Sequence, residues 1–288
     1  MINLRYHVIS LAAVLLALAA GIALGAGLLD EGDAAAPGAD GNTAEISSSL
    51  AGFDAGYATL TAPGLLRDQL KNRTVLLLTT PGARASEVDG LIENLTTSGA
   101  RVTGEVQLTT KLLSPSNRQF AEGVATQSDP DAAAAGSDYA AVGTAIARGY
   151  LTTGDGTLDD TARTIRSAFT EGDLLAADQD PEVSAQLALV VSGPAGASAG
   201  DEGTVVSSLV GALDAGSQGV AVVGPVSSGE NGVVNAVRSS DAAASVSTVD
   251  VTDTGTGRVA AILALVREAA GTSGAWGTSR AADGPVPN

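Results

Sequence analysis

The chain has 288 residues, with 15 Lys or Arg against 32 Asp or Glu, and a formal net charge of −17 at pH 7. This acidic excess repels the phosphate backbone, so the composition argues against nucleic-acid binding and favours a solvated acidic surface. No cysteine is present, which excludes a disulfide framework and thiolate metal sites. The length is sufficient for one or two domains with a sizeable core.

The first element is an uncharged run of 22 residues, Val8 to Leu29. As a helix it would span about 33 Å, slightly more than the roughly 30 Å hydrocarbon core of a bilayer. The sequence therefore predicts a single transmembrane helix over 8–29. Arg5 precedes the run and Asp30 follows it, and positive charge prefers the cytoplasmic side. We therefore expect residues 1–7 in the cytoplasm and the C-terminal domain outside it, which makes membrane lipid a partner.

Two alternatives concern the same run. A cleaved signal peptide could end at the small residues Ala23 to Ala26, although its apolar region is usually shorter, about 7–15 residues. Gly21 and Gly25 form a G-x-x-x-G pair that favours close helix pairing, and hence a homo-oligomer formed through the transmembrane helix. The alternative is that this pair reflects only the abundance of Gly and Ala in the chain.

The segment 30–45 is rich in Ala, Gly and Asp, and its low apolar content is typical of a flexible tether. A helix is predicted next, over 46–60, because five large apolar residues recur at intervals of four and three. Pro63 and Gly64 are expected to end this helix, before a short amphipathic piece over 65–70. The five apolar residues are Ile46, Leu50, Phe53, Tyr57 and Leu60.

Two strand–helix–strand units of similar layout follow, each of a size suited to a parallel crossover. Together they predict an α/β fold, with a Rossmann-like extracytoplasmic domain over 46–271. The first unit has its strand, helix and strand at 74–80, 86–97 and 101–108, and the second has them at 186–192, 202–215 and 219–223. A further helix, strand and helix are expected at 229–239, 246–251 and 257–270.

The region 115–180 lies between the two units and is predicted to be a helical insertion. Its helices are expected at 137–149 and 158–170, joined by acidic, Gly-rich links. The tail, 272–288, is expected to be irregular, with its one tryptophan, Trp276, docked on the domain.

The carboxyl ends of the predicted strands have only corners made of Gly and Pro, which are Pro-Gly at 81–82 and Gly-Pro at 193–194 and 224–225. None matches a dinucleotide or phosphate-binding loop. The segment 196–200 fits G-x-S-x-G, but no histidine follows it, and the single histidine, His7, lies at the predicted membrane edge. We therefore predict no catalytic residues, no cofactor and no enzymatic activity.

Acidic side chains are the remaining candidate metal ligands, and they could hold a hard cation such as calcium. None of the clusters has the spacing of an EF-hand loop, so solvated loop acids are the favoured interpretation and no metal site is predicted. The clusters are Asp129 with Asp131, Asp159 with Asp160, and Asp178 with Asp180 and Glu182.

Several stretches together resemble a known family, the actinobacterial copper transport outer-membrane proteins, or MctB family. They are the N-terminal MINLRYHVISLAAVLLALAAGIALGAGLL, then FDAGYATLTAPGLLRDQLKNRTVLLLTTPGA at 53–83, SGARVTGEVQLT at 98–109, and GAWGT at 274–278. The resemblance covers most of the chain, and its order and spacing are more specific than any single motif. The chain departs from the family pattern in one respect: many members of the family carry a coiled-coil segment after the span, where this chain has a low-complexity tether.

The resemblance implies a role in copper efflux and copper homeostasis across the cell envelope, with copper ion as the transported species. It also implies an outer-membrane location and an oligomeric channel, and it supplies no catalytic residues. The residues alone favour a second hypothesis, a structural or protein-interaction module of the envelope with its own protein partner.

Overall fold

The computed structural model describes residues 39–136, 139–177, 181–196 and 199–287. The chain divides into two units, residues 1–52 and 53–288. The transmembrane helix predicted over 8–29, including Gly21 and Gly25, lies outside the described residues. Within the described ranges, no helix combines the length and apolar character needed to cross a bilayer.

A sheet of seven strands forms the centre of the second unit, in the order β3-β2-β1-β4-β5-β6-β7. Every neighbouring pair is parallel except β2 with β3, which is antiparallel. This arrangement confirms a mixed α/β fold and both predicted strand–helix–strand units. The strands are β1 (Thr74–Thr79), β2 (Arg101–Leu108), β3 (Leu175–Ala176), β4 (Leu187–Val191), β5 (Val220–Val223), β6 (Ser247–Val249) and β7 (Ala275–Trp276).

The helices mostly follow the predicted order. Four of them, α4 (Thr110–Leu113), α5 (Arg118–Ser128), α6 (Tyr139–Tyr150) and α7 (Asp160–Glu171), lie between β2 and β3, and the last three form the helical insertion. The others are α2 (Ala39–Leu66), α3 (Ala85–Thr97), α8 (Ala199–Ala215), α9 (Val226–Asn231), α10 (Val233–Arg238) and α11 (Gly255–Ala269). Single 3-10 turns, η1 (Pro115–Asn117), η2 (Ala132–Ala135) and η3 (Asp241–Ala244), complete the described elements.

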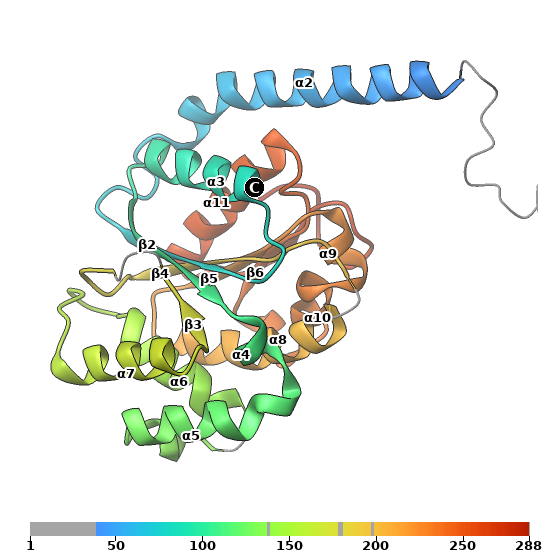
Figure 1. Cartoon of the computed structure of the whole chain (residues 1–288). Helices are drawn as coiled ribbons and strands as arrows, with labels where there is room; N and C mark the ends of the chain where they lie inside the picture. Colours follow the sequence, from blue (N-terminus) through green and yellow to red (C-terminus); the bar gives the residue numbers. More distant parts are fainter. Residues whose placement is uncertain (1–38, 137–138, 178–180, 197–198, 288) are drawn as a thin grey trace, which may run out of the picture. The chain divides into compact units, whose positions relative to one another are not determined.

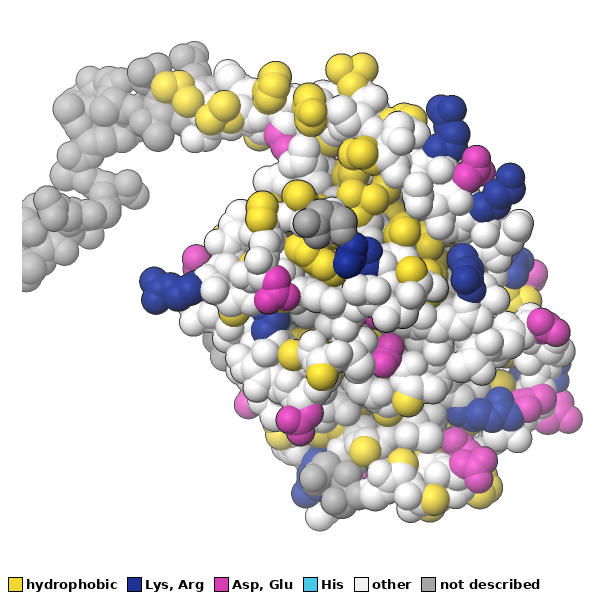
Figure 2. Space-filling model, turned by 180° about the vertical axis from the view of Figure 1, so that it is seen from behind, with side chains coloured by type: hydrophobic (Ala, Val, Ile, Leu, Met, Phe, Trp, Pro, Cys, Tyr) yellow, Lys and Arg dark blue, Asp and Glu magenta, His cyan; other side chains and the backbone are white. Residues whose placement is uncertain are grey.

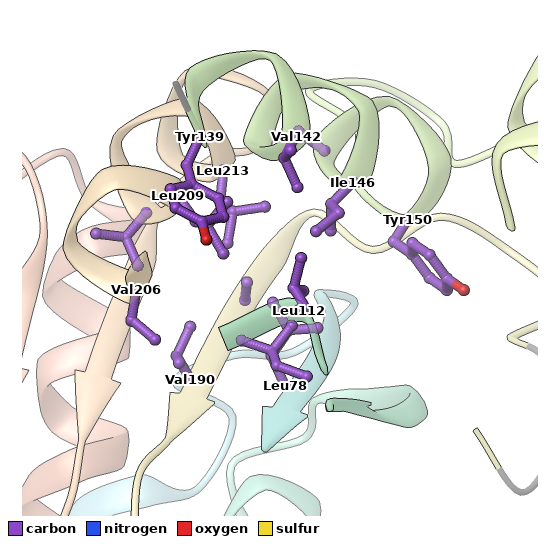
Figure 3. Packing of buried hydrophobic residues seen from close by; sticks show 14 of the residues in the cluster. Leu78, Leu112, Tyr139, Val142, Ile146, Tyr150, Val190, Val206, Leu209 and Leu213 are labelled. Carbon is purple, nitrogen blue, oxygen red and sulfur yellow. The ribbon is translucent and has the colours of Figure 1, made fainter. Parts of the chain in front are cut away.

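The central strands are buried on both faces, so successive side chains of a strand pack alternately into two separate hydrophobic cores. Leu76 and Leu78 of β1 face the cluster that α6 and α8 cover, whereas Leu77 faces the cluster that α3 and α11 cover. Figure 1 shows these helices on opposite faces of the sheet. Figure 3 shows Leu78 and its neighbours beneath α6. Such double burial explains why the strands have continuous apolar sequences instead of alternating ones.

Helix α2 begins and ends outside its predicted limits. It starts at Ala39, inside the segment interpreted as a tether, and it continues past Pro63 to Leu66. A proline lacks the amide hydrogen that a helix interior requires, so Pro63 leaves one carbonyl of the preceding turn without its usual partner. Only three more residues follow Pro63 before the helix ends. The buried Ala62 and Leu66 on either side of it hold this turn against the domain.

The helix predicted over 229–239 is instead two short helices, α9 and α10. Gly232 separates them in an extended conformation, with φ −120° and ψ −155°. The Ser228 hydroxyl accepts a hydrogen bond of 3.2 Å from the amide of Val234, so it satisfies one free donor at the start of α10. The apolar residues keep helical spacing on both sides of Gly232, so the sequence pattern gave no sign of the break between α9 and α10.

The prediction of an irregular tail is wrong at one point, because β7 adds a parallel strand beside β6. The docking of Trp276 is confirmed, since only 6% of its surface is exposed. The amide of Thr248 donates to the carbonyl of Gly274, and the amide of Asp250 donates to the carbonyl of Trp276. Two residues are too few to show strand periodicity in a sequence.

We predict that Gly257→Ala in α11 lowers the free energy of unfolding by about 1–3 kcal/mol, the usual cost of overpacking. A methyl group at Gly257 would lie 1.7 Å from the carbonyl oxygen of Val251, so the preceding loop would have to move. Gly211→Ala in α8 is the matched control, because a methyl group there meets nothing within 4 Å. It should instead stabilise the helix by about 0.5–1 kcal/mol. Chemical denaturation of both variants measures the difference, and equal stabilities would contradict the packing.

Candidate functional site

In an open α/β sheet, ligands usually bind beyond the carboxyl ends of the strands where the strand order reverses. Here the reversal lies between β1 and β4, so the loops after Thr79 and Val191 flank it. The structure brings together two of the corners identified in the sequence, at 79–83 and 192–196. The amide of Thr80 donates to the carbonyl of Val191 at 3.0 Å.

These two loops pack closely against each other at the crevice. The amide of Gly193 donates to the Thr80 hydroxyl at 3.3 Å. A side chain at Gly193 would lie 2.6 Å from the carbonyl carbon of Gly82, so only glycine permits this approach. The Gly-Pro corner therefore serves loop packing at the place where a nucleotide would bind in a related fold.

Two buried serines lie near this edge, Ser192 directly after β4 and Ser228 in α9, and their hydroxyls bond to each other. The Ser192 and Ser228 hydroxyls are 2.8 Å apart, both side chains are fully buried, and Ser192 also donates to the carbonyl of Val223. Nucleophilic serine requires a general base within hydrogen-bond reach. His7, the single histidine of the sequence, lies outside the described residues, and the pairing of the two hydroxyls fits a packing role.

Glu87 is a third buried polar group at this edge of the sheet. Its carboxylate accepts a hydrogen bond of 3.0 Å from the Thr252 hydroxyl and forms an ion pair of 2.8 Å with Arg84. The Glu87 carboxylate therefore has both of its partners within the protein. Through Thr252, it joins the start of α3 to the loop before α11. This arrangement is that of a structural tie between two elements that cover the same face.

The acidic clusters have separate structural roles where they are described. Asp159 accepts a hydrogen bond from the amide of Ala162 at the start of α7, and it pairs with Arg148, whose hydrogen bond holds the pKa of Asp159 below its usual value of 3.8. Asp129 accepts from the amide of Asp131 in a turn. Asp178 and Asp180 lie outside the described residues. Across the described ranges, no group of three or more His, Cys, Asp or Glu is placed to hold a metal ion.

A groove with a volume of about 720 Å³ runs along β2 and reaches β3. Its lining mixes charges of both signs, since Arg101 lies with Glu105 and Glu182. A smaller hollow of about 160 Å³ shares Thr79, Glu105 and Gln107 with it. The alternation of polar Glu105 and Gln107 with apolar Val106 is the feature of the sequence that indicates this surface.

A buried ion pair at the opposite edge of the sheet was also missed. Arg238 and Asp250 pair with 4% and 0% of their side chains exposed. Asp250 accepts from the amides of Thr278 and Ser279 at 2.7 and 3.2 Å, and Arg238 donates to the carbonyl of Trp276 at 2.8 Å. Burial alone would raise the pKa of Asp250, but the bonds from Ser279, Thr278 and Arg238 outweigh it and hold the pKa below 3.8.

Helix α2 presents a row of large apolar side chains to solvent. In the second unit, Phe53, Tyr57 and Leu60 are exposed by 71%, 53% and 83%. In the first unit, Ile46 and Leu50 are exposed as well. Figure 2 shows hydrophobic side chains along this helix. We call Phe53, Tyr57 and Leu60 the α2 stripe; exposed apolar surface of this kind marks an interaction site in many proteins.

Comparison of the sequence with known proteins places the chain in a family. A family model described as "Copper transport outer membrane protein, MctB" matches residues 1–287. Proteins named copper transporter MctB from Mycobacterium bovis and Mycobacterium tuberculosis are 28% identical to the chain over 304 aligned positions. Each alignment covers 92% of this chain and 92% of the relative. The match confirms the resemblance noted in the sequence and includes both units, and so the chain belongs to the MctB family.

Proposed function

We propose that this protein is a single-pass, membrane-anchored component of copper transport and homeostasis in the cell envelope. The observation that carries the proposal is the family match over residues 1–287 together with relatives named as copper transporters. Residues 8–29 form the anchor in this proposal, and the α/β domain lies outside the cytoplasm.

The residues of the α/β domain favour a role in protein interaction over a role in catalysis. The loops after β1 and β4 interlock, and the buried serines Ser192 and Ser228 bond to each other. Copper prefers thiolate, thioether and imidazole ligands, and the chain has no cysteine, one histidine and one methionine. We therefore propose that copper is handled as cargo by an assembly, and that the described domain is not itself a copper store or an enzyme.

A pore is part of the proposal only for an oligomer. One membrane-spanning helix has no lumen, so a conducting path would need spans from several copies of the chain, for which Gly21 and Gly25 offer a close-packing face. Planar-bilayer conductance tests this: purified full-length chain should conduct, and chain lacking residues 1–29 should not. If neither protein conducts, the pore is contradicted, and the chain would act in copper transport without forming a channel itself.

Deletion of the gene should raise the copper content of the cell and its sensitivity to added copper. Elemental analysis of washed cells measures the first effect, and growth across a copper series measures the second. Full-length protein should restore both values, whereas a chain without residues 1–29 should not, because the proposal needs the anchor. Unchanged copper content in the deletion strain would contradict the copper role.

The exposed apolar row on α2 favours a second candidate, a protein-interaction module of the envelope with no transport activity of its own. This candidate predicts a stable protein partner after crosslinking in intact cells and a deletion strain with normal copper. Recovery of only monomer would count against it.

A further inference from the structure

We infer that the protein binds a hard divalent cation, for which calcium is the best fit, at the amino edge of the sheet between the ends of α8 and α11. The side chains that would hold the ion are those of Asp214 in α8, Ser247 in β6 and Glu268 in α11. We call these three residues the Glu268 cluster. The inference is independent of the proposed role in copper transport, because copper prefers sulfur and imidazole ligands, which this cluster lacks.

The fold brings the two carboxylates of the cluster together from opposite sides of the sheet. Helix α8 packs into one hydrophobic core and α11 into the other, and Figure 1 shows the two helices on opposite faces. Glu268 lies against Gly219, directly before β5, where an added methyl group would meet its Cβ at 2.7 Å. Burial is the main cause that raises the pKa of Glu268, and the charge of Asp214 is near enough to add to the rise.

Two oxygen atoms of the cluster are buried without a hydrogen bond. In the part of the chain that the structure describes, the Oε1 of Glu268 and the Oγ of Ser247 have no hydrogen-bond partner. The two residues are exposed by only 4% and 0%. Leaving buried polar atoms unbonded is costly, so proteins usually satisfy them with another protein group, with water or with an ion. A cation coordinated by both oxygens would remove this cost.

The charge of the cluster favours a cation over a neutral ligand. Burial raises the pKa of Asp214 and of Glu268, and among the described groups that oppose the rise there are serines but no Lys or Arg. Arg267 precedes Glu268 in the chain, but its guanidinium lies over the ring of Trp276, 5.7 Å from the ring centre. Two carboxylates without a basic partner are best balanced by a divalent ion.

The ends of the two helices strengthen the preference for a cation. Asp214 and Glu268 are each the next-to-last residue of their helix, and the C-terminus of a helix carries a partial negative charge that attracts cations. Asp214 is partly buried, and Ser245 beside it is exposed. The cluster therefore reaches solvent at Asp214 and is enclosed at Glu268, so an ion can enter from the side of Asp214.

Calcium fits this set of ligands better than magnesium does. Calcium accepts six to eight oxygen ligands in flexible geometry, including carboxylates, backbone carbonyls and water, whereas magnesium requires a nearly ideal octahedron and releases its own water reluctantly. A site with only two carboxylates is expected to be weak. We expect a dissociation constant for calcium of about 10⁻⁴ to 10⁻³ M.

Calorimetric titration of calcium chloride into the purified full chain, after treatment with a chelator, tests the inference. At pH 8 most of Glu268, whose pKa is about 7, is ionised, so one calcium ion per chain should bind. Glu268→Gln and Asp214→Asn should each lose this binding. Asp241→Asn is the matched control, because it removes an exposed carboxylate in η3 and should bind calcium as the wild type does. No binding by the wild type, or binding that Glu268→Gln retains, would overturn the inference.

Urea denaturation at pH 8 gives a second readout. Millimolar calcium chloride should raise the urea midpoint of the wild type, because an ion that binds only the folded chain stabilises it, and it should leave Glu268→Gln unchanged. If Glu268→Gln fails to fold, Asp214→Asn at the outer end of the cluster provides the same comparison. Potassium chloride at equal ionic strength is the control for screening. An equal rise in potassium chloride, or no rise in calcium chloride, would mean that only water or a proton lies between Glu268 and Ser247, and would overturn the inference.

Discussion

Asp250→Ala should lower the free energy of unfolding by about 3–5 kcal/mol, the usual cost of removing one partner of a buried ion pair. The substitution leaves Arg238 charged and buried, and it removes the acceptor for the amides of Thr278 and Ser279. Chemical denaturation of the purified full chain at neutral pH measures the loss. Limited proteolysis should also show earlier cleavage near residue 278.

Arg163→Ala is the matched control for this prediction. Arg163 pairs with Asp160 at 2.7 Å, but their side chains are exposed by 61% and 101%. Exposed pairs contribute at most about 1 kcal/mol, because water and salt screen them. A loss of similar size in both variants would show that the burial of Arg238 and Asp250 is not what stabilises the edge of the sheet.

Glu268→Gln should make the protein more stable than the wild type at pH 8 and leave it little changed near pH 4. Burial raises the pKa of Glu268 from 4.5 to about 7, with Ser247 opposing the rise in part and Asp214 adding to it. A carboxyl group with a raised folded pKa stabilises fully below its unfolded pKa, and that stability is lost as pH rises through the folded pKa. The loss corresponds to about 3 kcal/mol at 1.36 kcal/mol per pH unit.

Urea denaturation of both proteins between pH 4 and pH 8.5 tests this prediction. The wild type should lose stability relative to the variant mainly between the two pKa values, 4.5 and about 7. Glu171→Gln is a control, since Glu171 is an exposed carboxylate at the end of α7. Parallel curves for wild type and Glu268→Gln would mean that Glu268 ionises in the folded protein as readily as in the unfolded chain.

The fold was largely predictable where apolar runs are continuous. Strands β1, β4 and β5 read as buried on both faces because nearly every side chain in them is apolar, and the helices between them have one apolar side. Short elements were not predictable on this basis. β7 is held by backbone hydrogen bonds from the amides of Thr248 and Asp250, and the start of α10 is held by the bond that the Ser228 hydroxyl accepts from Val234. Such bonds leave no periodicity in the sequence.

The candidate surfaces were harder to predict because they depend on residues far apart in the chain. Thr80 and Gly193 interlock across 113 positions, and Arg238 meets Ser279 across 41. The α2 stripe was visible as a helical spacing, but its exposure was not. An apolar row at intervals of four and three predicts burial in either a core or a partner, and only the structure showed that Ala58, and not Tyr57, faces the core.

The pairing of β7 with β6 covers one side of β6 at the margin of the sheet. Without residues 275–276, β6 would become the outermost strand, and its unpaired backbone groups would be open to pairing with a neighbouring chain. This two-residue strand therefore protects the domain against association through the edge of its sheet.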